Sequence, residues 1–495
     1  MKRLSELLQH IPFTEAVGSL EVPIEQLTYD SRAVRPGSCF FAIAGTQVDG
    51  HRFIASAIEQ GAVAVVCQHL PEQQPTGVTF VQVEQTEPVM AEMAAAMYDH
   101  PSRELKLVGV TGTNGKTTTA TLLYELVRRL GYRAGLISTV VYRIDDRAIE
   151  STHTTPDAIR LQAMMRQMVD AGCDYCFMEC SSHAIVQHRT HALHFAGVLF
   201  SNLTHDHLDY HGTFADYLKA KKGLFDQLPK GAFALINIDD RNGRVMVQNT
   251  AARVVTYALR SMADHRCRIQ EMHLDGMLLT LDGRELWSHL TGRFNAYNLL
   301  SVYAVAVELG FTQEEVLTAL SSLEPVSGRF ECVRALNGTI AVVDYAHTPD
   351  ALENVLTTIE EIRGGRGQLI VVCGCGGNRD RTKRPEMARI AVRYATTAIF
   401  TADNPRHESP EAILDEMVAG LEPTDRYVRL ADRREAIRTA VMLSQPGDVI
   451  LLAGKGHETY QIIGDEKLHF DDREEVRKAF EVWCGATSAN EKLKK

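Results

Sequence analysis

The segment VGVTGTNGKTTT, at residues 108–119, constrains the fold of this chain more than any other feature of the sequence. Apolar residues lead into a glycine-bearing turn and a helical pattern follows, which predicts a strand, a tight turn and a helix. Backbone N–H groups freed by Gly112 and Gly115, with the positive end of the helix, can hold phosphate. Lys116 adds a cation and Thr117 a hydroxyl for magnesium. We therefore expect a phosphate-binding loop for ATP, although its glycines lie closer together than in the usual loop.

Length and charge narrow the class of protein. A chain of 495 residues exceeds one hydrophobic core and predicts about three domains. The net charge of −11 argues against a nucleic-acid partner, because surfaces that bind phosphate backbones are basic. The sequence has neither a signal peptide nor an apolar run long enough for a membrane span, so we expect a cytoplasmic protein. Cys173, Cys176 and Cys180 lie in and beside a predicted buried strand and are expected to be buried thiols rather than metal ligands.

Alternating strands and helices predict an α/β fold with three domains. We expect a small N-terminal α/β domain at 1–104, a central ATP-binding domain with a parallel sheet and phosphate loop at 105–328, and a C-terminal Rossmann-like α/β domain at 329–495. Ligands should gather at the carboxyl edges of the parallel sheets. A period-two pattern with a turn at Asp275-Gly276 predicts an antiparallel hairpin within the central domain. Residues 485–495, rich in Lys, Ser and Asn, are predicted to be a disordered tail.

Two predicted strand ends carry side chains suited to metal ions. Glu179 ends the strand Tyr175–Glu179, and a carboxylate beside a phosphate loop is typical of an Mg²⁺ ligand. The next strand runs into NLTHDHLDYHG, where three histidines and two aspartates fall within residues 205–211. We assign one of them, His207, to a second divalent ion. Lys221 follows in a helix, where the residues alone indicate only a solvated charge.

Nine ordered motifs resemble those of the Mur ligase family across nearly the whole chain. They are TGTNGKTTT, MECSSHAIVQHR, NLTHDHLDYHG, GRFNAYN, SGRFE, VDYAHTPD, CGCGGNRD, DNPR and GKGHE. The resemblance implies an ATP-dependent ligase that adds an amino acid to the peptide of the bacterial cell-wall precursor. Within the family, the chain is most similar to the ligases that add a diamino acid to UDP-N-acetylmuramoyl-L-alanyl-D-glutamate.

The resemblance also implies roles for particular residues. The UDP-precursor set is Tyr29, Ser31, Thr46, Gln47, His153, Thr154, Thr155, Ser181, Gln187 and Arg189. The ATP set is Gly112, Thr113, Asn114, Gly115, Lys116, Thr117, Thr118, Asn295, Asn298, Arg329, Asp344 and His347. The metal set is Thr117, Glu179, His207 and Lys221, the last as a carbamate formed with CO₂, and it implies two Mg²⁺ ions. Lys116, His207 and Lys221 are the implied catalytic residues, and His153 stands where family members often have Asn.

The choice of amino acid rests on the DNPR motif. The residues alone predict only a loop at Asn404-Pro405. The resemblance makes this loop part of a diaminopimelate pocket that comprises Arg379, Asp403, Asn404, Pro405, Arg406, Gly454 and Glu458. The guanidinium of Arg406 can grip a carboxylate with two hydrogen bonds, which favours the distal carboxylate of meso-diaminopimelate over lysine. Glu458 suits the distal ammonium.

The implied reaction begins when the D-glutamyl carboxylate attacks the γ-phosphate of ATP, and the amine then attacks the acyl phosphate. Three alternatives stay open: the same ligation with L-lysine, a ligase similar to folylpolyglutamate synthase, and a nucleotide-driven switch or scaffold. The separate N-terminal domain with its DSR motif at 30–32 and the DNPR loop argue against the second alternative. The complete metal and amino-acid sets argue against the third. We expect a monomer.

Overall fold

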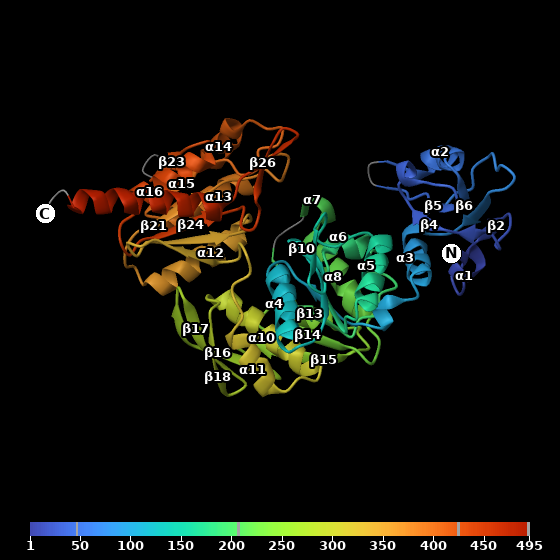
Figure 1. The fold of residues 1–495 in the computed structure, drawn as a ribbon, viewed down its shortest axis with the longest axis horizontal. Coiled ribbons are helices and arrows are strands. Elements are labelled where there is room, and N and C mark those ends of the chain that lie inside the picture. Colours follow the sequence, from blue (N-terminus) through green and yellow to red (C-terminus); the bar gives the residue numbers. More distant parts are fainter. Residues whose placement is uncertain (46–47, 205–207, 423–425, 493–495) are drawn as a thin grey trace. The chain divides into compact units, whose positions relative to one another are not determined.

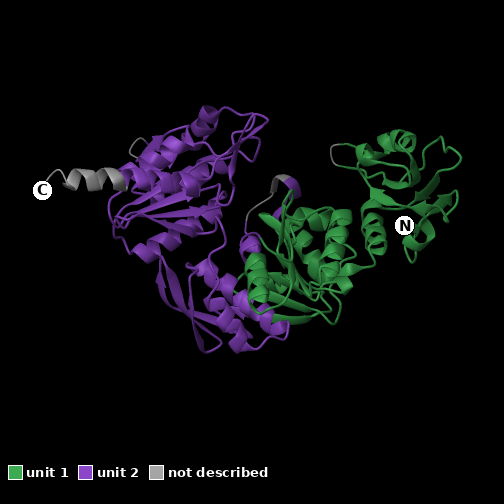
Figure 2. Ribbon diagram, in the orientation of Figure 1, with its two compact units in different colours: residues 1–112, 119–202, 215–256 green, residues 113–118, 203–214, 257–495 purple. Residues whose placement is uncertain are grey.

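The computed structural model describes residues 1–45, 48–204, 208–422 and 426–492, with the backbone alone at 208–209 and 484–492. Figure 1 follows its helices and strands along the chain. Contacts between residues divide it into two compact units, coloured in Figure 2. The first unit holds Met1–Gly112, Thr119–Asn202 and Ala215–Thr256, and the second holds Thr113–Thr118, Leu203–Phe214 and Tyr257–Lys495. The tip of the phosphate loop therefore belongs to the second unit.

The N-terminal part of the first unit is a sheet covered by helices on both faces. Its strands run in the order β2 (Glu15–Val17), β7 (Thr79–Gln82), β6 (Ala62–Cys67), β5 (Ser38–Phe41) and β4 (Gln26–Thr28). β4 to β7 pair in parallel, and β2 is antiparallel. Because side chains alternate along a strand, Phe41 packs with α1 (Leu4–Leu7) and α3 (Thr86–Met97), whereas Phe40 packs with α2 (Ile54–Glu59). A short pair, β1 (Lys2–Arg3) and β3 (Pro23–Ile24), lies outside this sheet.

A largely parallel sheet forms the rest of the first unit. Its parallel strands are β9 (Ala134–Ile137), β12 (Tyr175–Glu179), β8 (Lys106–Thr111), β13 (Gly197–Phe200) and β14 (Phe233–Asn237), in that spatial order. An antiparallel pair that the sequence pattern does not predict, β10 (Val141–Ile144) and β11 (Arg147–Glu150), continues the sheet beyond β9. The connecting helices are α4 (Lys116–Arg129), α5 (Ala158–Asp170), α6 (Ser182–Val186), α8 (Phe214–Asp226) and α9 (Gly243–Met246), whereas α7 (Leu208–His211) belongs to the second unit.

The second unit opens with antiparallel structure. The last residues of β15 (Arg253–Ala258) pair in parallel with β16 (His265–His273), and β16 then forms antiparallel pairs in the order β16, β17 (Gly276–Leu281) and β18 (Arg284–Ser288). His273 pairs with Gly276 across the turn, so the predicted hairpin is confirmed. Two helices, α10 (Arg293–Glu308) and α11 (Gln313–Ser321), follow.

The C-terminal sheet is covered on both faces and carries most of the candidate ligand-binding loops. Its strands run in the order β19 (Glu331–Arg334), β20 (Ile340–Asp344), β24 (Val449–Ala453), β21 (Leu369–Cys373), β22 (Thr397–Phe400) and β23 (Tyr427–Arg429), all parallel except β19. Val371 packs with α12 (Pro349–Arg363), α13 (Lys383–Tyr394) and α14 (Pro410–Val418). Its neighbour Val372 packs with α15 (Arg433–Leu443) and α16 (Asp472–Lys492). A hairpin of β25 (Tyr460–Ile463) and β26 (Glu466–His469) precedes α16.

The last helix differs from the sequence expectation. α16 is assigned through Lys492 and so continues into the segment predicted to be a disordered tail. Val476, Ala479 and Phe480 pack its first turns onto the sheet. Once packed turns have nucleated a helix, each further residue adds a hydrogen bond at low cost. Among the described residues, no helix combines the length and apolar character needed to cross a lipid bilayer.

A buried ion pair joins α15 to α16. The Arg433 guanidinium donates to the two carboxylate oxygens of Asp472 at 2.8 and 2.6 Å and to the Ala453 carbonyl at 3.1 Å. Neither charged side chain is exposed to solvent. Removing one member of such a pair leaves a buried charge without compensation.

We predict that Asp472→Ala lowers the free energy of unfolding by about 3–5 kcal/mol, because Arg433 would stay buried without its counter-charge. Urea unfolding followed by circular dichroism measures the loss. The matched control is Asp415→Ala, whose carboxylate pairs with Arg429 on the surface at 2.6 Å and should cost less than about 1 kcal/mol. Equal losses in the two variants would contradict the prediction.

Candidate active site

Three neighbouring strands of the first unit end at one edge and build the base of the phosphate loop. Val110 of β8 lies beside Glu179 of β12, and Thr111 lies beside Phe200 of β13. Gly112 follows with a φ of +149°, and a β-carbon there would collide with the Ser201 hydroxyl. The turn therefore needs glycine for its backbone conformation and for the close approach of β13.

The side chain of Lys221, on α8, contacts the base of the phosphate loop at Gly112. Its side chain is buried, its Nζ donates to the Gly112 carbonyl at 2.8 Å, and it lies 4.8 Å from the centre of the Tyr217 ring. The sequence alone indicates a solvated lysine, so this burial is a finding of the structure. A long cationic side chain held inside a protein needs such specific partners.

Glu179 is buried at the same edge. Its carboxylate accepts hydrogen bonds from the backbone N–H of Thr139 at 2.7 Å and from the Thr139 hydroxyl at 3.2 Å. Oxygen atoms are the ligands that Mg²⁺ prefers, so the carboxylate of Glu179 is chemically suited to its predicted role as a magnesium ligand. Among the described residues, His, Cys, Asp and Glu form no group of three or more that could hold a metal ion. His207 lies outside the described residues.

Four of the predicted precursor-binding residues form one connected group: Thr155, Ser181, Gln187 and Arg189. The Thr155 hydroxyl donates to the Glu179 carbonyl at 2.8 Å and accepts from the Ser181 N–H at 3.2 Å. Arg189 donates to the Thr155 carbonyl at 2.7 Å and to the Gln187 side chain at 2.6 Å. This network ties the segment 153–156 to the end of β12.

The other predicted precursor-binding residues have separate contacts or lie outside the described residues. The Thr154 hydroxyl accepts from Thr139 at 3.1 Å, and the His153 N–H donates to the Tyr142 hydroxyl at 3.0 Å. Tyr29 is partly exposed, and its pKa is raised by burial and by the nearby Asp157 carboxylate. Ser31 begins a short 3₁₀ turn capped by Asp30. Thr46 and Gln47 lie outside the described residues.

The tip of the phosphate loop lies in the second unit, among residues from the C-terminal motifs. Lys116 Nζ donates to the Thr113 carbonyl at 2.7 Å, and Arg329 donates to the Thr117 hydroxyl at 3.3 Å. Asn114 donates to the Asp350 carboxylate at 2.8 Å. Thr118 is buried at the start of α4. The charged groups of Lys116 and Arg329 thus lie at the turn that the sequence predicts to bind phosphate.

Asn295 and Asn298 support this loop from α10. Asn298 donates to Asn295 at 3.0 Å, and Asn295 donates to the Thr291 carbonyl at 2.8 Å. Gly115 has a φ of +87°, and a β-carbon there would lie 2.6 Å from the Asn298 amide oxygen. A side chain at Gly115 would therefore displace Asn298.

Aromatic and charged side chains surround Tyr345, directly after β20. The Tyr345 ring centre lies 4.6 Å from the Arg329 guanidinium, 4.7 Å from the His347 ring and 5.0 Å from the His457 ring. Burial, with the nearby cations, lowers the pKa of His457 to about 3, so this imidazole is neutral. Asp344 accepts the N–H groups of Phe330 and Ala346 at 2.7 and 2.8 Å, and burial raises its pKa.

The predicted amino-acid pocket forms at the carboxyl edge of the C-terminal sheet. Asn404 donates to the Glu458 carboxylate at 2.8 Å, and Lys455 donates to the same carboxylate at 3.1 Å. Asp403 Oδ1 lies 3.7 Å from Lys455 Nζ and is buried with no hydrogen-bond partner in the described part of the chain. Gly454 has a φ of +115°, and a β-carbon there would lie 3.5 Å from the Asp403 carboxylate. Such a cluster of carboxylates can receive a substrate ammonium.

Arg406 adopts a left-handed backbone with a φ of +52° beside this pocket. Its Nη1 donates to the Gly377 carbonyl at 3.0 Å, and its own N–H donates to the Ile462 carbonyl at 3.0 Å. Pro405 presents its carbonyl so closely to Gly377 that a β-carbon there would collide with it. Arg379 is exposed and donates to the adjacent Asn378 carbonyl at 3.4 Å, so its link to the pocket stays a prediction.

Lys455, Tyr345 and Asp350 are site residues that the sequence analysis does not single out. All three lie inside quoted motifs, GKGHE for the first and VDYAHTPD for the others. Lys455 is fully buried between Glu458 and Asn404, which a glycine-flanked lysine does not indicate. The motifs therefore contain these residues, but only the folded structure shows which side chains they contact.

A glycine turn at the edge of one parallel sheet and a cluster of charged side chains at the edge of a second α/β sheet are the features predicted for an ATP-dependent amide ligase. Three family models match the chain: "Mur ligase family, catalytic domain" at residues 23–103, "Mur ligase middle domain" at 110–306 and "Mur ligase, glutamate ligase domain" at 328–456. The chain belongs to the Mur ligase family.

Individual relatives match almost the full length. A protein of Phocaeicola vulgatus named UDP-N-acetylmuramoyl-L-alanyl-D-glutamate--2,6-diaminopimelate ligase is 53% identical over 480 residues, which covers 97% of this chain and 99% of the relative. A protein of Geobacillus thermodenitrificans with the same name is 44% identical over 490 residues, with 96% and 99% covered. A solved structure of a ligase of that name is 32% identical, has a TM-score of 0.69 and covers 97% of this chain and 99% of its own.

These matches confirm the resemblance to the Mur ligases and the three-domain α/β fold class. They also confirm an ATP-dependent amide ligase. The domain boundaries and the roles of single residues stay predictions.

Glu458 generates a prediction about pH. Burial, with repulsion from Asp403, raises its pKa above the ordinary value of 4.5. Because only the ionised carboxylate pairs with a substrate ammonium, kcat/KM for the diamino acid should fall as pH decreases through this raised pKa. Glu458→Gln should lower kcat/KM and flatten that acidic limb.

The measurement is a pH series of initial rates at limiting diamino acid. The matched control is Glu466→Gln, which alters an exposed carboxylate on β26 and should keep the wild-type profile. An unchanged acidic limb in Glu458→Gln would count against this role.

Proposed function

We propose that this chain joins meso-diaminopimelate to UDP-N-acetylmuramoyl-L-alanyl-D-glutamate and splits ATP to ADP and phosphate. The observation that carries the proposal is the pocket in which Asn404, Lys455 and Glu458 meet, with Arg406 beside it. It offers a carboxylate for an ammonium and a guanidinium for a carboxylate, as the distal end of diaminopimelate requires. The names of the full-length relatives support the same substrate pair.

The phosphate loop supports the first step of the reaction. The D-glutamyl carboxylate attacks the γ-phosphate of ATP and gives an acyl phosphate and ADP. Lys116 and the amides of the loop would stabilise negative charge on the transferring phosphoryl group, and Arg329 next to Thr117 would add a second cation. The amine of diaminopimelate then attacks the acyl carbon, phosphate leaves and the amide forms.

Magnesium belongs to the same proposal. Thr117, Glu179, His207 and Lys221, the last as a carbamate, would hold two ions, which neutralise charge on the phosphates when bound. Carbamate formation would replace the ammonium of Lys221 with an anion that offers oxygen ligands. A monomeric state, a cytoplasmic location and domain boundaries at 104 and 328 complete the proposal.

Ligation of L-lysine is the second candidate. Lysine lacks the distal carboxylate, so it would leave the Arg406 guanidinium without an anionic partner. Folylpolyglutamate synthase-like activity finds no support in the N-terminal domain or the DNPR loop. A switch without ligase activity finds none in the amino-acid pocket.

We predict that, with the UDP-dipeptide and ATP present, meso-diaminopimelate supports phosphate release, whereas L-lysine and L-ornithine give only residual rates. Arg406→Met should raise the KM for diaminopimelate about 10-fold to 100-fold, as expected for the loss of hydrogen bonds between charged groups. Arg438→Met, at an exposed position on α15, is the control. Preference of the wild type for lysine would overturn the substrate assignment.

We predict that Lys116→Ala lowers kcat at least about 10²-fold to 10³-fold, because charge on the phosphoryl group loses a positioned cation. Binding of the UDP-dipeptide, measured by calorimetry, should persist because its residues lie in the first unit. Lys219→Ala, at an exposed position on α8, is the matched control. Turnover close to the wild-type rate in Lys116→Ala would remove the phosphate-loop assignment.

A further inference from the structure

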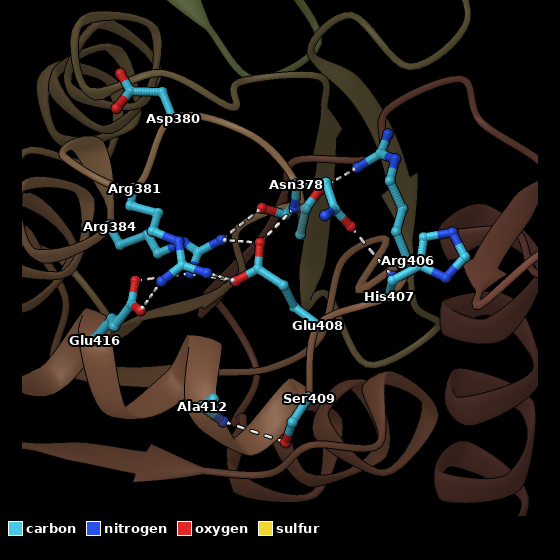
Figure 3. Close-up of polar contacts among 12 residues, drawn as sticks. Asn378, Asp380, Arg381, Arg384, Arg406, His407, Glu408, Ser409, Ala412 and Glu416 are labelled. Atoms are coloured by element: carbon cyan, nitrogen blue, oxygen red, sulfur yellow. Dashed lines mark hydrogen bonds and ion pairs between the residues drawn. The ribbon is translucent and has the colours of Figure 1, made fainter.

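Arg384 is a buried cation that the ligase reaction does not use directly. It lies on α13 and has no exposed side-chain surface. Its Nη1 donates to Glu408 at 3.0 Å and to Glu416 at 2.7 Å, and its Nη2 donates to Glu408 at 3.1 Å and to the Gly376 carbonyl at 3.2 Å (Figure 3). A buried guanidinium with this many directed hydrogen bonds fixes the groups it contacts.

Two of these partners, Gly376 and Glu408, come from the two loops that carry the proposed amino-acid ligands, whereas Glu416 lies on α14. We call residues 374–382, between β21 and α13, the first pocket loop, and residues 401–409, between β22 and α14, the second pocket loop. The first contains Gly376 and Arg379, and the second contains Arg406 and Glu408. Arg384 therefore holds both loops at once.

Glu408 extends the connection across the two loops. Besides Arg384, its carboxylate accepts the backbone N–H of Asn378 (Figure 3). Asn378 in turn accepts the His407 N–H on its side-chain oxygen at 3.2 Å, and the Gly377 N–H donates to the Asn404 carbonyl at 2.9 Å. Hydrogen bonds from Arg384 and Asn378 lower the pKa of Glu408 to about 2, so it is ionised at neutral pH.

The backbone of these loops requires such support. Asn378 and Arg406 both adopt left-handed conformations, with φ of +53° and +52°. A residue other than glycine in this region costs about 1–3 kcal/mol and persists where its surroundings determine it. The first pocket loop has glycine at 374, 376 and 377, so few side chains are available to pack it in place.

A short path leads from Arg384 to the Arg406 guanidinium. Arg384 holds the Gly376 carbonyl, and Glu408 holds the Asn378 N–H. Gly377 lies between these two anchors, and its carbonyl accepts the hydrogen bond from Arg406 Nη1 at 3.0 Å. A β-carbon on Gly376 would lie 3.0 Å from the same Nη1, so a small shift of this loop would move the guanidinium.

We propose that Arg384 and Glu408 are positioning residues that orient Arg406 and thereby set the preference for a diamino acid with a distal carboxylate. The inference rests on the proposed function, in which Arg406 binds that carboxylate. Arg384 and Glu408 act through the two pocket loops and do not touch the substrate. Displacing a binding group by about 1 Å can cost up to about 100-fold in rate.

Glu408→Gln is the main test, because it keeps the size of the side chain and removes its charge. We expect the KM for meso-diaminopimelate to rise about 10-fold or more, with KM values for ATP and the UDP-dipeptide close to wild type. Residual turnover of L-lysine should stay unchanged, since lysine offers no distal carboxylate. The ratio of kcat/KM for the two amino acids therefore falls.

A double-variant cycle separates positioning from a general structural effect. If Glu408 acts through Arg406, Glu408→Gln should add nothing to the KM of Arg406→Met, because the group it orients is gone. An equal, independent rise in both backgrounds overturns the proposal. So does a lower melting temperature of Glu408→Gln with the KM for diaminopimelate unchanged.

Arg381 provides the matched control. It donates to the same two carboxylates, Glu408 at 3.0 Å and Glu416 at 3.1 Å, but its side chain is 63% exposed. Arg381→Lys should leave the KM for diaminopimelate near wild type, whereas Arg384→Lys should raise it as Glu408→Gln does. Arg384→Lys keeps a positive charge in place and serves as the second variant if Glu408→Gln unfolds.

Assays of the wild-type enzyme separate the positioning role of Arg384 and Glu408 from the proposed function. A wild type that ligates diaminopimelate while Glu408→Gln and Arg384→Lys keep its KM overturns only the positioning role. A wild type that prefers lysine overturns the proposed function itself.

Discussion

Parallel pairing in the C-terminal sheet is the constraint on which the amino-acid pocket depends. Asp344 at the end of β20 lies beside Ala453 at the end of β24, and Cys373 at the end of β21 lies beside Phe400 at the end of β22. Parallel strands bring their carboxyl ends to one edge, so the loops that follow them converge there. Residues distant in sequence, such as Asn404 and Glu458, meet because their strands run in the same direction.

The first unit uses the same constraint for phosphate chemistry. Glu179 ends β12, Gly112 directly follows the neighbouring parallel strand β8, and Ser201 follows β13, which ends at Phe200. The side chain of Lys221 then closes the base of the loop by donating to the Gly112 carbonyl. The strand ends thus place the Glu179 carboxylate and the glycine turn at one edge of the sheet, and Lys221 binds that turn.

Sequence patterns predicted the central parallel strands of the sheets, because buried strands form continuous apolar runs, but not the short edge strands β4 and β23. They missed the β10–β11 pair and the β25–β26 hairpin, whose strands mix polar and apolar residues. Motifs located most candidate site residues, yet not the burial of Lys455 or Arg384. A charged residue in a sequence normally indicates a surface position, and the carboxylates that keep these two inside come from other elements of the fold.

Buried cations around the C-terminal pocket explain how glycine-rich loops keep one geometry. Arg433 holds the Ala453 carbonyl at the end of β24, Lys455 holds Asn404 and Glu458, and Arg384 holds the two pocket loops. Each cation costs desolvation energy, and an apolar side chain of similar size is often at least as stabilising. What charge pairs add is direction, because each hydrogen bond fixes a particular carbonyl or carboxylate. The proposed discrimination between amino acids that differ by one distal carboxylate depends on such direction, because the group that binds the carboxylate must be held in a fixed orientation.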